Sequence, residues 1–132
     1  MGILKDKSFS FALRVIKLSK YLVEEKKEYV LSKQILRSGT SVGANIREAQ
    51  NAQSKADFIH KLSISQKECD ETMYWLELLH QSEYISEIEF NSTYKDANEL
   101  LKMLRSAIIT SKNNKVGEEE NVYNNQVISY DL

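Results

Sequence analysis

The stretch of sequence that decides the fold runs from Gln34 to Leu79 and reads QILRSGTSVGANIREAQNAQSKADFIHKLSISQKECDETMYWLELL. Neither this stretch nor the rest of the chain contains Pro, so no helix interior is interrupted. Its apolar and small residues recur at alternating spacings of three and four, the period of one helical face. Ser54, followed three residues later by Asp57, has the pattern of a capping box and marks a helix start. The stretch therefore predicts a helical hairpin.

The same spacing predicts one further helix on each side of this hairpin. We expect helices near residues 8–25, 33–53, 55–81 and 87–112, with Ser32 capping the second and an S-x-x-E box at Ser86 opening the fourth. Together they predict an all-α, up-down antiparallel four-helix bundle over residues 1–112, without a strand. The expected core faces are Phe11, Val15, Leu18 and Leu22; Ile35, Gly39, Val42, Ile46 and Ala49; Phe58, Leu62, Ser65, Cys69, Thr72, Leu76 and Leu79; and Phe90, Tyr94, Ala97, Leu101, Leu104 and Ile108.

The periodic pattern stops after Lys112. Residues 1–113 carry 17 Lys and Arg against 15 Asp and Glu, whereas residues 114–132 carry one Lys against four acids. We therefore interpret residues 113–132 as an acidic C-terminal tail that is flexible or pinned by a neighbouring subunit. A single Cys69, a polar N-terminus and the lack of an apolar run of about 20 residues indicate a cytoplasmic protein with no membrane partner.

No group of residues predicts a catalytic or metal site. Asp57-x-x-His60 and Glu77-x-x-His80 have the spacing of di-iron ligand pairs, but both lie on one predicted helix, twenty residues or roughly 30 Å apart. The two histidines have no plausible nucleophile beside them, and no Gly-rich phosphate loop occurs. We expect no enzymatic activity, no metal, no cofactor and no small-molecule substrate.

Gly39 and Gly43 lie inside a predicted helix, where each costs roughly 1 kcal/mol relative to Ala. We expect them to allow close helix packing, with Ser65, Cys69 and Thr72 facing them across the hairpin. A ligand groove is the alternative. On the polar side of the same hairpin, Ser41, Asn45 and Glu48 lie level with a row of polar residues on the next helix, and the count back from the turn pairs Glu48 with Lys61.

The first helix has more apolar surface than one bundle core can bury. Phe9, Leu13 and Ile16 lie off the Phe11 stripe, so we expect them to form a homo-oligomer interface, the alternative being partial cover by neighbouring helices. Cations lie off the core faces of the first two helices: Arg14, Lys17, Arg37 and Arg47. They are either solvated surface or phosphate contacts, and oligomerisation would multiply a weak nucleic-acid-binding patch.

Three segments, RSGTSVGANIREAQ from Arg37, SKADFIHKL from Ser54 and KECDETMYWL from Lys67, carry a family resemblance. They resemble the four-helix-bundle family of 23S rRNA intervening-sequence proteins, also called the S23 ribosomal protein family. The chain is similar as well to the accessory variability determinant proteins of diversity-generating retroelements. The likeness covers residues 7–112 and is strongest between Ser38 and Leu76.

The resemblance implies an up-down four-helix bundle, a ring-like homopentamer and no enzymatic activity. For the retroelement members it also implies binding to nucleic acid and to a reverse transcriptase. We therefore expect a non-enzymatic, oligomeric accessory protein that binds nucleic acid, as structured RNA, DNA or an RNA–protein complex such as one with a reverse transcriptase, and the resemblance favours this function. The alternative is a protein–protein assembly module with no nucleic-acid role, which the nearly balanced charge favours.

Overall fold

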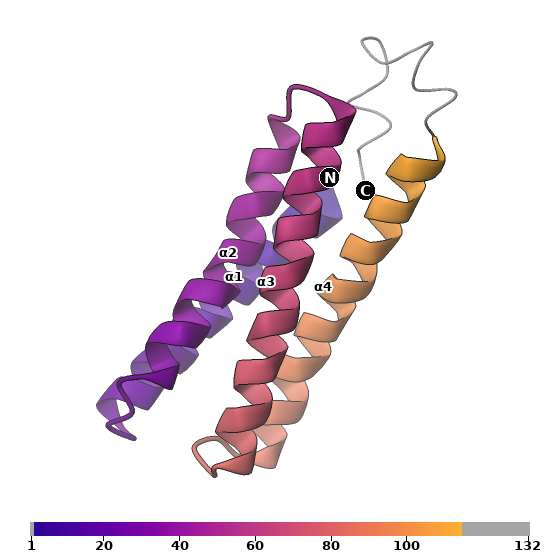
Figure 1. Cartoon of the computed structure of the whole chain (residues 1–132). Helices are drawn as coiled ribbons and strands as arrows, with labels where there is room; N and C mark the ends of the chain where they lie inside the picture. Colours follow the sequence, from indigo (N-terminus) through magenta and orange to yellow (C-terminus); the bar gives the residue numbers. More distant parts are fainter. Residues whose placement is uncertain (1, 115–132) are drawn as a thin grey trace.

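The computed structural model describes residues 2–114 and contains four helices. These are α1 (Gly2–Glu24), α2 (Leu31–Gln50), α3 (Lys55–Gln81) and α4 (Glu87–Asn113). Each helix runs antiparallel to the one before it, so that α1 starts and α4 ends at the same end of the bundle (Figure 1). No strand occurs within residues 2–114. The all-α, up-down four-helix bundle predicted from the sequence is confirmed.

The predicted core faces are the observed ones, with two exceptions. All predicted core residues of α1, α2 and α3 are buried, as are those of α4 from Ala97 onward. Phe90 and Tyr94 are only half-buried, because they lie where α4 meets the surface of α3. There the Phe90 ring stacks on His80 at 4.4 Å between ring centroids, and the Tyr94 hydroxyl donates to Glu77 at 2.8 Å.

The predicted helix boundaries need three corrections. Helix α1 begins at Gly2 rather than near residue 8, and Leu4, seven residues before Phe11, extends its buried face backward. Helix α2 begins at Leu31 and ends at Gln50, three residues before the expected end. Its N-cap is Val30, which makes no side-chain cap bond, so the prediction that Ser32 caps this helix is wrong.

A buried glutamate takes over the capping of α2. Glu28 is 9% exposed, and its carboxylate accepts hydrogen bonds from the backbone N–H groups of Val30, Leu31 and Ser32 at 3.3, 3.0 and 2.7 Å. The first N–H groups of a helix have no partner within it, so this carboxylate satisfies donors that would otherwise be buried without an acceptor. The caps predicted at Ser54 and Ser86 are confirmed, with Oγ accepting from Asp57 N and Glu89 N at 3.1 Å each.

The two helical glycines pack against α1 and not against α3. A Cβ at Gly39 would lie 2.7 Å from Cγ1 of Val15, and one at Gly43 would lie 3.3 Å from Oγ of Ser8. The prediction of close helix packing is therefore confirmed, but the partner expected across the hairpin is wrong. The α3 residues face other positions of α2, as in the bond from Ser65 Oγ to the Val42 carbonyl at 2.8 Å.

The acidic tail predicted for residues 113–132 lies almost entirely outside the described residues. Among the four described helices, none is long and apolar enough to cross a membrane.

Candidate functional site

The outer face of α1 carries a row of exposed apolar side chains. Phe9, Leu13 and Ile16 are 58, 49 and 38% exposed, although the same helix buries Phe11, Val15, Leu18 and Leu22 completely or nearly so. The bundle core therefore leaves the second set partly exposed and partly covered by the chain's own helices. We call Phe9, Leu13 and Ile16 the α1 apolar row. Its role in an interface stays a prediction.

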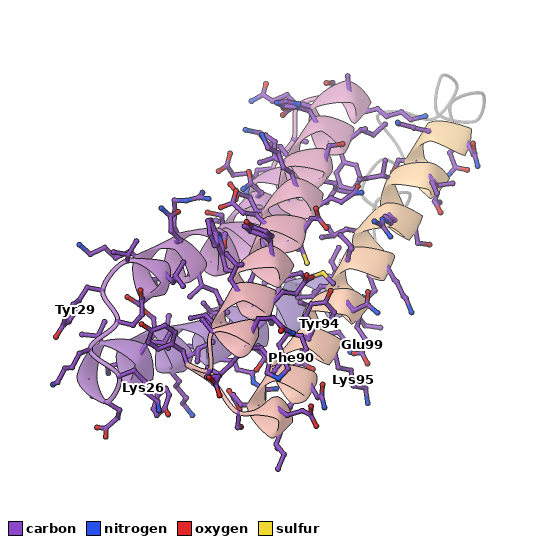
Figure 2. All side chains as sticks on the ribbon, turned by 60° about the horizontal axis from the view of Figure 1, so that its bottom comes forward. Lys26, Tyr29, Phe90, Tyr94, Lys95 and Glu99 are labelled. Carbon is purple, nitrogen blue, oxygen red and sulfur yellow. The ribbon has the colours of Figure 1, made fainter. Side chains whose placement is uncertain are left out.

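Ion pairs link α1 to α4 and α2 to α3 at the surface of the bundle. Between α1 and α4, Arg14 donates to Asp96 at 2.9 Å, to Ser92 at 2.7 Å and to Glu89 at 3.5 Å. Lys7 donates to Glu99, which projects from α4 in Figure 2, at 3.0 Å. That bond lowers the pKa of the Glu99 carboxyl below its ordinary value. Side chains of opposite sign therefore join α1 to α4.

The side between α2 and α3 is a polar seam. Lys61 donates to Glu48 at 2.8 Å, which confirms the predicted pair, and this hydrogen bond raises the pKa of the Lys61 ammonium. Asn45 is half-buried and donates to the Ser41 carbonyl at 2.9 Å.

Further along this seam, Thr72 and Ser38 share a buried hydroxyl–hydroxyl bond of 2.8 Å. Arg37, one residue before Ser38, donates to Glu68 at 3.1 Å and also forms an ion pair with Glu71. The bond to Glu68 is the main cause that raises the pKa of the Arg37 guanidinium. The sequence analysis missed this second pair, although the register that joins Glu48 to Lys61 also brings Arg37 level with these two acids.

The four cations predicted to contact nucleic acid do not form one patch. Arg14 and Lys17 line a groove of about 690 Å³ between α1 and the start of α4, together with Leu13 and Tyr21. Arg37 lies on the α2–α3 seam, and Arg47 lines a separate groove between α1 and α2. Arg14 and Arg37 are engaged by carboxylates, whereas Lys17 and Arg47 are exposed and form no ion pair with another described residue.

Within residues 2–114, no group of three or more His, Cys, Asp or Glu side chains is placed so that it could hold a metal ion. Cys69 is fully buried, and its thiol lies 3.2 Å from the Ala97 carbonyl. Burial raises the pKa of this thiol to about 12, with the charge of Asp70 adding to the shift. A thiol held neutral in this way is a poor nucleophile, and it packs as a small apolar group.

The protein is therefore an all-α four-helix bundle whose surface carries the α1 apolar row. The family model described as 23S rRNA-intervening sequence protein matches residues 3–106, and the chain belongs to this family. A solved structure from Bacteroides thetaiotaomicron VPI-5482, described as a protein with unknown function from the S23 ribosomal protein family, is similar, with 59% sequence identity and a TM-score of 0.79. The similarity covers 80% of this chain and 97% of that one. No curated protein matches the chain.

Proposed function

We propose that this protein is a non-enzymatic helical-bundle module that self-associates through α1. The observation that carries the proposal is the α1 apolar row, whose three side chains lie on one face and are each more than one-third exposed. Burying a large apolar side chain contributes roughly 1.5–3 kcal/mol, so several per subunit can offset the entropy lost on assembly. The resemblance to ring-forming proteins favours closure into a homopentamer.

Substitution of Leu13 tests this proposal. Leu13→Glu places a charge in the centre of the α1 apolar row without touching the buried stripe, so we expect an oligomeric wild type and a folded monomeric variant in sedimentation velocity at micromolar concentration. Gln34→Glu, which adds the same charge at an exposed position of α2, is the matched control and should leave the assembly intact. A monomeric wild type would contradict the proposal.

Nucleic-acid binding is the second candidate function. It is supported by the family description, which refers to 23S rRNA, and by Lys17 and Arg47, two exposed cations that no described carboxylate engages. The partners proposed from the resemblance are structured RNA, DNA or a ribonucleoprotein such as one that contains a reverse transcriptase. The proposed cytoplasmic location is compatible with these partners.

Filter binding with structured RNA separates the two candidates. Phosphate contacts strengthen as salt falls, so binding should be strongest at low ionic strength and should weaken in Arg47→Gln. Arg37→Gln serves as the comparison, because its guanidinium is already engaged by Glu68 and Glu71. The same assay with duplex and single-stranded DNA covers the other proposed partner, and if neither RNA nor DNA is retained at low ionic strength, the nucleic-acid function is excluded and self-association stands alone.

A further inference from the structure

A groove of about 740 Å³ runs between the first half of α1 and the second half of α2. Its lining includes Phe9, Ala12, Thr40, Gly43, Ala44 and Arg47. Gly43 and Ala44 contribute almost no side-chain volume, so the side of the groove formed by α2 is open. Phe9 lines the opposite side, which α1 forms. The groove can therefore receive apolar side chains from a segment that lies along it.

The charges around this groove favour an acidic occupant. Lys5 and Arg47 both line it, are exposed, and form no ion pair with another described residue. The carboxylate of Glu48, which also lines the groove, is engaged by Lys61 at 2.8 Å. Asp6 lines the groove as well, is exposed, and forms no ion pair with another described residue, so the unengaged charges are two cations and one acid. This excess of positive charge beside apolar residues fits a segment that carries both carboxylates and apolar residues.

The chain itself contains such a segment. Three consecutive acids, Glu118 to Glu120, precede Val122, and the last residues are Ile128, Ser129, Tyr130, Asp131 and Leu132. In an extended peptide, alternate residues share a face, so this spacing places Ile128, Tyr130 and Leu132 together. The acids and the apolar residues thus match the two features of the groove.

The point at which the described chain ends makes the groove reachable. Helix α4 ends at the end of the bundle where α1 begins (Figure 1). The groove lies along the first half of α1. The 18 residues from 115 to 132 span up to about 60 Å when extended, whereas a helix of 23 residues such as α1 is about 35 Å long. The segment is long enough to cross the end of the bundle and run along the groove.

We propose that residues 118–132 dock in the α1–α2 groove of their own subunit, with the apolar residues against Phe9 and Ala44 and the acids near Lys5 and Arg47. This docking goes beyond self-association and does not rest on it. Phe9 belongs to both surfaces, and docking leaves Leu13 and Ile16 of the α1 apolar row to a second copy.

Paramagnetic relaxation in the full chain tests the docking. A nitroxide attached at Ser129→Cys reports on the segment, and the buried Cys69 thiol does not compete for the reagent. We expect loss of amide signal intensity around Phe9 to Ala12 and Thr40 to Arg47. Ala44→Glu, which puts a carboxylate in the exposed groove wall, should restore these intensities, whereas Gln34→Glu outside the groove should not.

The same label distinguishes the occupants. A mixed sample contains two kinds of chain: Ser129→Cys chains that carry the nitroxide but no isotope label, and isotope-labelled chains that carry no nitroxide. Broadening of the groove signals in this mixture would mean that a second copy supplies the segment, and would overturn docking within one subunit. In the chain that carries both the nitroxide and the isotope label, groove signals of full intensity would also overturn docking within one subunit. So would a loss of intensity that Ala44→Glu leaves unchanged. Sedimentation of the same samples reports self-association separately.

Discussion

Gly39 shows how a single missing side chain sets the distance between two helices. An added Cβ would meet Val15, which is fully buried, at 2.7 Å from Cγ1. Overpacking costs roughly 1–3 kcal/mol, against about 1 kcal/mol of helix propensity gained. We expect Gly39→Ala to lower the free energy of unfolding by about 1 kcal/mol, measured by urea denaturation with an unchanged m-value.

Gly43→Ala is the matched control for this substitution. Its added Cβ would approach Ser8 Oγ at 3.3 Å, a much milder contact at the edge of the helix pair. The propensity gain should then prevail, leaving the variant equally stable or more stable. Equal stabilities for the two alanine variants would argue against the close approach of α1 and α2 at Gly39.

Cys69 predicts a dependence of stability on pH. The pKa of its thiol is about 12 in the folded protein and near 8.5 in an unfolded chain. Between these values the unfolded chain releases the proton first, so the free energy of unfolding should fall as pH rises, by at most about 1.4 kcal/mol per unit. Below about pH 8 this contribution is constant.

The Cys69→Ala variant isolates that contribution. Its stability relative to wild type, measured by urea denaturation from pH 7 to 11, should be lower and constant below pH 8, and the difference should shrink at higher pH. A difference that stays constant throughout would show that the thiol does not titrate between the two states.

At the level of the helices, the periodic core faces were predictable from the sequence, and the start of α2 was not. Ser54 and Ser86 cap their helices through local bonds to residues three positions on, a pattern visible in sequence. Glu28 caps α2 from outside the helix, and its burial depends on how the α1–α2 connection folds back. No spacing rule singles out Glu28 from the neighbouring charged residues Glu24 to Lys27.

Paired substitutions test which residue caps α2. Glu28→Ala removes the acceptor of three backbone N–H groups and should lower the free energy of unfolding by about 2 kcal/mol. Ser32→Ala should have little effect or a favourable one, because the buried Ser32 Oγ makes no hydrogen bond within the described residues. Glu28→Gln, which keeps one acceptor oxygen, should lie between the two in urea denaturation.

For the whole molecule, the α1 apolar row was predictable because it needs only the count of apolar residues per helical turn. Which carboxylate each cation pairs with was not predictable in general, because the pairing depends on the register between helices. Lys61 and Glu48 flank a short turn, so their pairing could be counted. Arg14 and Asp96 lie 82 residues apart, and their contact requires the closed bundle.

The Arg14 cluster therefore predicts a structural effect that its exposed neighbour Lys17 should not share. Arg14→Met keeps the apolar stem but removes three hydrogen bonds to α4, and it leaves Asp96 and Glu89 without their counter-charge. After allowance for solvent screening at these partly exposed groups, we expect a loss of about 1 kcal/mol that shrinks in high salt. Lys17→Met, which removes a cation with no described ion-pair partner, should change the free energy of unfolding by less than about 0.5 kcal/mol. Equal effects of the two substitutions in urea denaturation would mean that the Arg14 ion pairs do not hold α1 against α4.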